Sequence, residues 1–392
     1  MSEVAPSGRA PWAREKVFPK KPDTGDYGVV DEKRAGRSFE SLEKLQAYLE
    51  AGKGRLAWVW VPEFPRLVAP EEVPELLASL RKRRLIFAAE DAEEARRTLP
   101  FSGLALLYAL FLYGSGGRAF GLAGLDLLVL AVFAFLYFTG RPWWEARKGR
   151  VAAEKLTAES MAGEVPEARF DLWLEQQKTP CTLVLAGLLV LLGAGQWVAE
   201  GSGIGAAGFD KTRYVLGEKW RLFTGAFLHG NLIHFILNAS ALWYLGRRVE
   251  ILARWPHLAG VFFLSILGAG WASLVWKPLQ ISVGISGAVC GLLGFLLVFE
   301  TLHRGLVPRP ARRRLAAILI SLVGIGILGF RFIDNAAHFG GLATGAAYAL
   351  VVFPKSSSLR RPVILWQDRL IGGVALLLIF GSAVGALAAM LT

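Results

Sequence analysis

The chain divides into two parts by its pattern of hydrophobic and polar positions. Residues 1–98 mix apolar with charged positions, and no apolar stretch among them is long enough to cross a bilayer. From residue 99 onward, nearly uncharged stretches recur. Each is close to the ~20 residues that a helix needs, at 1.5 Å per residue, to cross ~30 Å of hydrocarbon. They predict nine membrane-spanning helices, at residues 99–117, 119–140, 180–199, 224–246, 256–276, 284–299, 315–330, 335–354 and 370–392.

Residues 1–98 are predicted to form a soluble region. The first 37 are rich in proline and scattered basic residues, which predicts disorder, and they contain no apolar segment of the kind found in signal peptides. Leucines at helical spacing behind an imperfect capping box predict a helix at residues 38–51. Residues 56–61 favour a strand, and residues 71–84 and 90–97 favour helices. We therefore expect a small α+β unit here, to which the sequence assigns no function.

Charge orients the predicted helices. The chain has 44 basic and 32 acidic residues, a net charge of +12, and the basic residues gather in alternate connections between the spans. By the positive-inside rule, these connections and the N-terminus face the cytoplasm, and the C-terminus faces outward. The Lys and Arg residues lie at the ends of the predicted helices. This placement argues against nucleic-acid binding, because a nucleic-acid-binding protein needs a basic surface on a folded domain. The basic connections include residues 81–84, 96–97, 141–150, 247–254, 304–314 and 355–361.

Composition narrows the class further. Hydrophobic residues make up 54% of the chain and charged residues 19%, with a mean hydropathy of +0.42, which is more apolar surface than a soluble core of this length could bury. The two cysteines, Cys181 and Cys290, both lie in apolar stretches and exclude a disulfide framework and a cysteine-based zinc site. The sequence also lacks a phosphate-binding loop, a dinucleotide-binding glycine pattern and a metalloprotease His-Glu motif.

Polar residues inside predicted spans are candidates for function, because burying them in hydrocarbon costs free energy. His234 and Asn238 stand four residues apart on one helix, so their side chains point to the same face and offer two donors to one point. Taken alone, the pair is more often a structural link between helices. His229 lies near the outer end of the same span and is expected to form hydrogen bonds within the preceding loop.

Ser286 lies in the sequence Gly284-Ile285-Ser286-Gly287, where an outward loop enters a span. A serine at a helix N-terminus meets unpaired backbone N–H groups and the positive end of the helix dipole, and both would stabilise an oxyanion beside it. The alternative is a small residue packed in a glycine interface, since Gly287, Gly291 and Gly294 form such a stripe.

His338 opens the eighth predicted span, four residues after Asp334, a suitable helix N-cap. Gly341 and Gly345 form a flat face that we expect to pack against the Gly287 stripe and to bring the imidazole to Ser286. A nucleophile, a base and two oxyanion donors at similar depth predict a hydrolase site.

At these residues the sequence resembles the rhomboid intramembrane serine proteases over residues 180–354. Gly284-Ile285-Ser286-Gly287 is similar to the family's G-x-S-G motif, His338 and Gly341 to its A-H-x-x-G helix, His234 and Asn238 to its H-x-x-x-N pair, and Trp220-Arg221 to the Trp-Arg of its first outer loop. The resemblance implies that Ser286 is the nucleophile and His338 the general base. It also implies that His234, Asn238 and the Ser286 N–H form the oxyanion site, with no cofactor and no metal.

The resemblance implies an all-α polytopic protein with a six-helix core, two extra N-terminal spans and one extra C-terminal span. Five domains are expected. They are a soluble N-terminal region (residues 1–98), two leading spans (99–140), a cytoplasmic connector running along the membrane surface (141–179), the catalytic core (180–354), and a basic linker with the final span (355–392). One departure is Cys290, which replaces the aromatic residue that some family members place beneath the histidine.

The expected substrates are transmembrane helices of other proteins, cleaved near the outer face of a membrane, most simply a bacterial inner membrane. Two alternatives remain. One is a non-catalytic membrane-protein binder or chaperone on the same fold. The other is a transporter or proton relay. A relay would need acidic residues within the spans, and the core offers only Glu300, near a cytoplasmic end, so the scarcity of carboxylates disfavours it.

Overall fold

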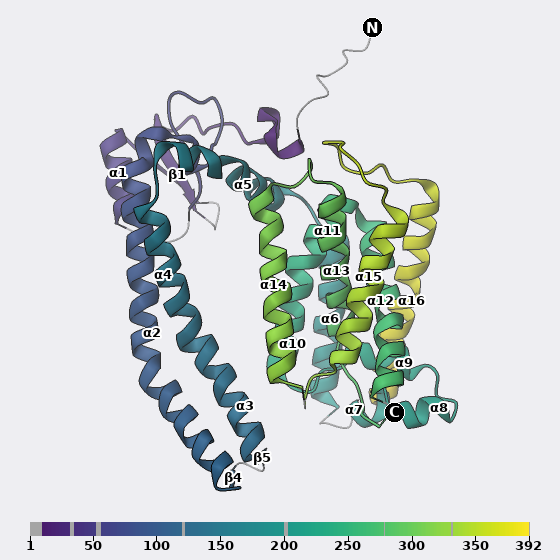
Figure 1. Ribbon diagram of the computed structural model, residues 1–392. Coiled ribbons are helices and arrows are strands. Elements are labelled where there is room, and N and C mark those ends of the chain that lie inside the picture. The colour runs from purple at the N-terminus through teal and green to yellow at the C-terminus, as the bar shows by residue number, and fades with distance from the viewer. Residues whose placement is uncertain are drawn as a thin grey trace. The chain divides into compact units, whose positions relative to one another are not determined.

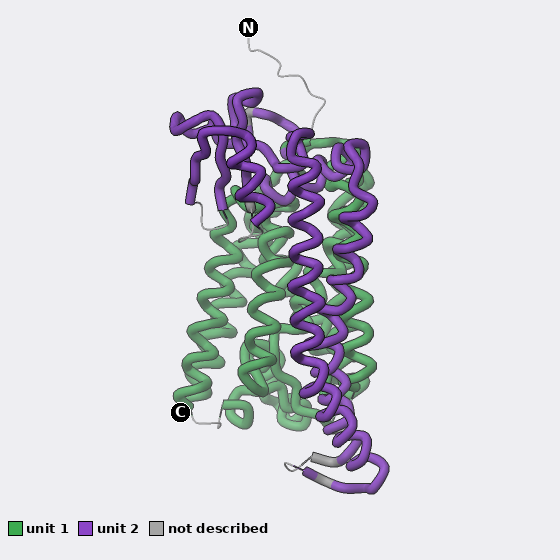
Figure 2. Tube along the Cα trace, turned by 90° about the vertical axis from the view of Figure 1, so that its left-hand side faces the viewer, with its two compact units in different colours: residues 1–11, 174–392 green, residues 12–173 purple. Residues whose placement is uncertain are grey.

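The computed structural model describes residues 10–31, 35–51, 56–119, 122–199, 203–277, 279–330 and 332–391. The chain separates into two compact units. The first along the chain, Trp12–Trp173, is drawn in purple as unit 2 in Figure 2, and the second, which includes Leu174–Thr392, is drawn in green as unit 1.

A three-stranded antiparallel sheet lies in the first unit, with the strand order β2-β1-β3. Its central strand, β1 (Tyr27–Asp31), pairs with β2 (Gly36–Phe39) and β3 (Leu56–Trp60). The strand predicted at residues 56–61 is confirmed. By contrast, β1 lies inside the stretch predicted to be disordered. Of that stretch, residues 1–9 lie outside the described part, and η1 (Pro11–Ala13) and η2 (Glu15–Val17) are short 3₁₀ turns.

Helix α1 (Leu42–Glu50) covers the sheet with its apolar face. Leu45 and Leu49 are fully buried against strand residues, as their helical spacing predicted. The helix begins later than predicted, because Ser41 is the N-cap and its side chain accepts the backbone N–H of Lys44. The preceding residues pair with β1 instead of joining the helix.

Two long helices form a hairpin in the same unit (Figure 1). α2 (Leu77–Gly114) is continuous through 38 residues, so the predicted break between helices at 71–84 and 90–97, and the break before the first span, are wrong. After a turn bearing β4 (Arg118–Ala119) and β5 (Leu122–Ala123), α3 (Gly124–Phe135) runs through a π-helical turn, η5 (Leu136–Gly140), into α4 (Arg141–Glu154). Ser102 and Thr139, whose hydroxyls lie 2.7 Å apart, tie the two arms together.

Helix α5 (Ala158–Gln176) is attached to the sheet region by ionic and apolar contacts. Glu72 is the last residue of the turn η3 (Pro70–Glu72), which is followed by the turn η4 (Pro74–Leu76). Its carboxylate binds Arg66 at 2.9 Å and also Arg169 of α5. Burial alone would raise the pKa of the Glu72 carboxyl, but hydrogen bonds from Arg169 and Arg66 hold it below its usual value. Residues 141–154 and 158–176 are thus helical, as the connector was expected to be, whereas their position along a membrane surface remains a prediction.

The second unit is a bundle of helices (Figure 1). Their bounds agree with most of the predicted spans: α6 (Pro180–Val198), α10 (Leu232–Ala241) continuing through η7 (Leu242–Gly246) into α11 (Arg247–Ala253), α12 (Trp255–Trp276), α13 (Ser286–Leu302), α14 (Arg309–Leu328), α15 (Asn335–Val352) and α16 (Trp366–Leu391).

The span predicted at residues 224–246 differs from the structure at its start. The chain before it folds as short turns, and the helix begins only at Leu232, where the side chain of the N-cap Asn231 accepts the backbone N–H of His234 at 2.8 Å. The short elements are α7 (Gly203–Ala207), α8 (Lys211–Val215), α9 (Arg221–Thr224) and η6 (Gly225–Phe227). The apolar residues before Leu232 therefore pack in a loop rather than in the spanning helix.

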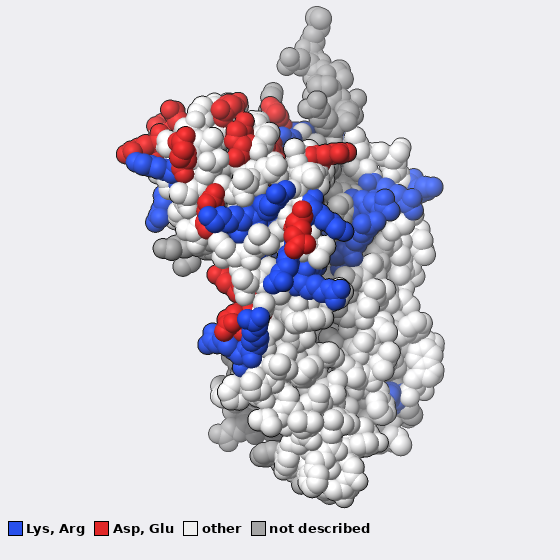
Figure 3. All heavy atoms as spheres, turned by 60° about the vertical axis from the view of Figure 1, so that its left-hand side comes forward, with Lys and Arg blue, Asp and Glu red and all other residues white. Residues whose placement is uncertain are grey.

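The protein is a polytopic integral membrane protein, and its bundle is all-α. Four described helical segments are long and apolar enough to cross a membrane, and Ser286–Leu302 is apolar but shorter. On the face drawn in Figure 3, a large part of the surface shows no Lys, Arg, Asp or Glu side chains, as a surface in contact with lipid requires. The number of spans, nine, remains a prediction. The four segments are Leu127–Glu154, Pro180–Val198, Trp255–Trp276 and Trp366–Leu391.

Glycines set the closest helix packing in the bundle, between α13 and α15. A Cβ built on Gly341 would lie 1.9 Å from the carbonyl oxygen of Gly287, and one on Gly345 would lie 1.8 Å from that of Gly291. Backbone therefore packs directly on backbone, which only residues without a side chain permit. The predicted contact between these two glycine faces is confirmed.

Candidate active site

Ser286 is the first residue of α13, after a tight turn at Gly284. Gly284 has φ +107°, a conformation that residues with side chains rarely adopt, and its N–H donates to the Gly225 carbonyl at 3.1 Å. Because Ser286 occupies the first helical position, backbone N–H groups of the first turn lack intrahelical acceptors and face the reaction space beside its hydroxyl.

His234 and Asn238 of α10 face this turn together. A Cβ at Gly284 would lie 2.8 Å from Cε1 of His234 and 3.5 Å from Nδ2 of Asn238, so the absence of a side chain at Gly284 lets both polar groups approach. Asn238 is 5% exposed, and its Nδ2 meets no acceptor among the described residues. A buried donor without a partner costs roughly 1–3 kcal/mol, and such sites in folded proteins call for a functional reason.

His338 lies in the first turn of α15, beside the start of α13. The carbonyl of Ala337 lies 3.4 Å from the position of a Cβ on Gly287, which brings this turn of α15 next to Ser286. The His338 ring is also near enough to that of His234 for the two to interact electrostatically. Among the described contacts there is no hydrogen bond between Ser286 Oγ and His338, a bond that in unliganded sites often forms only when substrate is bound.

Asp334 fixes the start of α15. Its Oδ1 accepts the backbone N–H of Ala337 at 3.0 Å, and its Oδ2 accepts hydrogen bonds from the hydroxyls of Ser273 and Ser282. Burial alone would raise the pKa of the Asp334 carboxyl. The hydrogen bonds from Ser273 and Ser282 outweigh this effect, and the pKa lies below its usual value. The N-cap expected from the sequence is confirmed.

Lys211 of α8 completes this polar cluster. Its ammonium donates to Ser282 Oγ at 2.6 Å and to the Gln280 carbonyl, and it lies 3.8 Å from Asp334 Oδ2. Burial lowers the pKa of Lys211 to about 8, with the Asp334 charge acting in the opposite direction. No local sequence motif marks Lys211, Ser273 and Ser282 as neighbours of the site, because these residues come from different loops and helices.

A small cavity adjoins Ser286. Its volume is about 50 Å³, and Ser273, Ser282 and Asp334 contribute polar atoms to its lining. At roughly 10–15 Å³ for each water centre, the cavity has room for a few water molecules with several polar partners.

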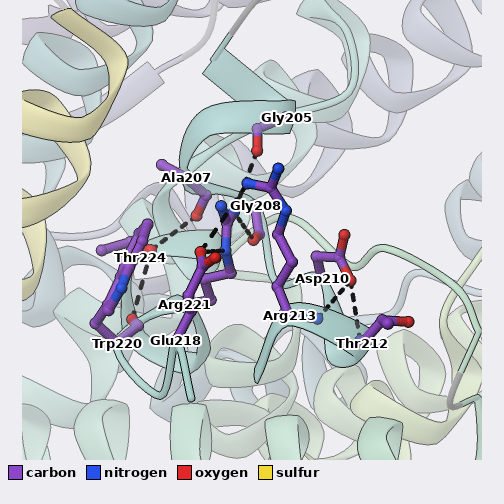
Figure 4. A network of polar contacts seen from close by, with 10 residues as sticks. All are labelled: Gly205, Ala207, Gly208, Asp210, Thr212, Arg213, Glu218, Trp220, Arg221 and Thr224. Atoms are coloured by element: carbon purple, nitrogen blue, oxygen red, sulfur yellow. Dashed lines mark hydrogen bonds and ion pairs between the residues drawn. The ribbon is translucent and has the colours of Figure 1, made fainter. Parts of the chain in front are cut away.

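Trp220 and Arg221 organise the loop that precedes α10 (Figure 4). Arg221 is 1% exposed, and its guanidinium donates to the carbonyls of Gly205 and Gly208 at 3.2 and 3.0 Å and pairs with Glu218. The same guanidinium stacks on the Trp220 ring. Arg221 therefore fixes the loop that supplies the Gly225 carbonyl.

Cys290 and His229 complete the sequence-based candidates. Cys290 is buried in α13, one turn beyond Ser286. His229 is held differently from the sequence expectation, because its backbone N–H and carbonyl pair with the side chain of Gln196 on α6, at 2.8 and 2.6 Å, rather than within the preceding loop. Its ring packs edge-on against that of His234.

Comparison with known proteins places this site in a family. The model of the rhomboid domain matches residues 216–355, the segment that contains all of the candidate residues. The chain contains a rhomboid domain. Its rhomboid domain is 37% identical over 147 residues to rhomboid protease GluP of Bacillus subtilis, a match that covers 36% of this chain and 28% of GluP.

Two further relatives mark the functional range of the rhomboid family. RHOMBOID-like protein 4 of Arabidopsis thaliana is 32% identical over 146 residues, 37% of each chain. Inactive rhomboid protein 2 of Homo sapiens is 33% identical over 142 residues, 36% of this chain and 16% of that protein. The matched rhomboid segment thus spans less than half of each of these relatives, and the family includes proteins named as proteases and proteins named as inactive.

Among the described residues of this rhomboid protein, no group of three or more His, Cys, Asp or Glu side chains is arranged to hold a metal ion.

Proposed function

We propose that this rhomboid protein is an intramembrane serine endopeptidase that cleaves transmembrane helices of other proteins near the outer face of its membrane. The observation that carries the proposal is the buried Asn238 amide, whose Nδ2 meets no acceptor in the described part of the chain and faces the turn before Ser286. A structural His-Asn link would use that donor, whereas an oxyanion site keeps it available for the charge that forms during the reaction.

In the proposed mechanism, Ser286 attacks the scissile carbonyl while His338 accepts its proton and then returns it to the leaving amine. His234, Asn238 and the Ser286 N–H stabilise the oxyanion. Water then hydrolyses the acyl-enzyme, with His338 as the base, and the cavity beside Ser286 gives that water a polar place to reside. No cofactor takes part.

The substrate helix must unwind locally, because an intact helix hides its carbonyls in i to i−4 hydrogen bonds. Gly284, Gly287 and Gly341 support the site by allowing close backbone approach. We further propose a bacterial inner-membrane location with the N-terminus in the cytoplasm, on the basis of the basic connections between spans.

The test is cleavage of a transmembrane reporter helix by the purified full-length protein in liposomes. Wild type is compared with Ser286→Ala, His338→Ala and the control Ser240→Ala, which alters an exposed serine of α10. We expect cleavage by wild type and the control alone, and labelling of Ser286 by a fluorophosphonate. An uncleaved reporter with no labelling of Ser286 would replace the protease by a membrane-protein binder on the same fold.

A further inference from the structure

A second cavity lies at the opposite end of α13 from Ser286, where α13 ends and α14 begins. Its volume is about 530 Å³, ten times that of the cavity beside Ser286. Its lining combines arginines with apolar side chains and a carboxylate: Arg304, Arg309, Arg312, Arg313, Leu297, Leu315, Ala316, Thr301 and Glu300.

The positive charge of this cavity is not balanced by its own lining. Glu300 is the one carboxylate there, and it already forms a two-pronged ion pair with Arg248, at 2.6 and 2.9 Å, in which both side chains are buried. The Nε atom of Arg312 is buried and meets no acceptor among the described residues. Arg304 also lies near enough to repel the charge of Arg312. The lining therefore carries more positive than negative charge.

Helix polarity adds to this charge. α14 starts at Arg309, with Pro308 as its N-cap, so the positive end of a 20-residue helix dipole points toward the cavity. The N-cap offers no side-chain acceptor to the free N–H groups of the first turn. An anion held here would meet both the guanidinium forks and the helix end.

The apolar part of the lining favours an anion that carries an acyl chain over a free inorganic anion. Leu297, on α13, and Leu315 and Ala316, one turn or more into α14, form the apolar part of the lining. A free inorganic anion would gain nothing from this surface, whereas an acyl chain would. Ala316 is exposed, so its surface is available.

We infer that this arginine cavity binds the phosphate of an anionic phospholipid, with an acyl chain along Leu297, Leu315 and Ala316. Arginine forks match the oxygens of phosphate, and basic pockets between spanning helices suit anionic headgroups. A zwitterionic lipid carries its own cation and cannot neutralise the cluster. The inference does not depend on the proposed proteolysis.

The test measures binding by the purified full-length protein in detergent. The probes are dioctanoyl phosphatidylglycerol, dioctanoyl phosphatidylcholine and inorganic phosphate, and the readout is the shift of the thermal unfolding midpoint with probe concentration. The cavity variant Arg309→Gln/Arg313→Gln alters two exposed arginines. Its matched control, Lys355→Gln/Arg360→Gln, removes two exposed charges from the segment whose Ser356 N–H binds the Leu302 carbonyl at the end of α13.

We expect phosphatidylglycerol to stabilise wild type and the control equally, and its apparent affinity to fall roughly tenfold or more in the cavity variant. Ala316→Trp, which fills the apolar part without changing charge, should weaken phosphatidylglycerol in the same way. Equal effects of phosphatidylcholine, or equal affinities of the cavity variant and its control, would overturn the inference. Equal stabilisation by inorganic phosphate, insensitive to Ala316→Trp, would make this a free-phosphate site and overturn the lipid assignment.

Discussion

The ammonium of Lys211 lies 3.8 Å from the carboxylate of Asp334, four residues before His338. This pair joins α8 to the N-cap of the helix that carries the proposed base. Ser273 and Ser282 bind the same carboxylate, so one acidic group connects α15 to three other segments beside Ser286.

Asp334→Asn tests whether the charge of Asp334 positions His338. Asparagine is also a good N-cap, so α15 should still form, but the Lys211 cation loses its partner. We expect a several-fold loss of kcat with little change in KM, and a change in the pH–rate profile, because the removed charge interacts electrostatically with His338. An unchanged pH–rate profile would show that Asp334 acts only as the N-cap of α15.

Lys211 predicts a pH dependence of stability. Its pKa in the folded protein is about 8, below its ordinary value of 10.5, so between these values the unfolded chain holds more protons. The Lys211 contribution to the free energy of unfolding should therefore rise with pH from about 8 to about 10.5 and be constant below 8, with a total on the order of 3 kcal/mol.

The measurement is the thermal unfolding midpoint of wild type and Lys211→Met from pH 7 to 10.5. Methionine retains most of the side-chain length without a charge, so the difference between the two proteins should change across this window. Parallel curves would show that Lys211 titrates at its ordinary pKa.

Asn238→Ala separates a catalytic donor from a structural one. Removing one oxyanion donor typically costs about 10²–10³ in kcat, and we expect a loss of that size in reporter cleavage. The midpoint of thermal unfolding should fall only by the amount expected from the lost packing of the Asn238 side chain. No hydrogen bond of Nδ2 is lost, because this donor meets no acceptor among the described residues. Asn231→Ala is the matched control, because it removes the α10 N-cap and should reduce stability instead.

Gly345→Ala tests the contact between α13 and α15. The added methyl would lie 1.8 Å from the carbonyl of Gly291, so the helices must separate, which we expect to cost several kcal/mol of stability and to reduce cleavage. Gly187→Ala is the control, because a Cβ there meets nothing within 4 Å. It should leave stability unchanged or raise it by roughly 0.5–1 kcal/mol. Similar midpoints for both variants would contradict the close packing.

The sequence by itself determined most of the bundle and the identity of the candidate site residues. Apolar stretches of spanning length located α6 and the helices from α10 to α16, because burial in lipid dictates composition directly. Glycines four apart predicted the contact of α13 with α15, since small residues at helical spacing leave a face for close approach. Ser286, His338 and the His234–Asn238 pair stood out because polar groups within apolar stretches are costly.

Tertiary structure decided the rest. Strand β1 is stabilised by pairing with β2 and β3, and its own sequence resembles a disordered segment because sheet pairing depends on residues far along the chain. α10 begins at Leu232 rather than at residue 224 because the preceding apolar residues pack in a loop fixed by Arg221. The Lys211–Asp334 pair and the arginine cavity join residues that no local pattern connects. Only the folded chain brings those charges together, because their energies depend on distance and burial.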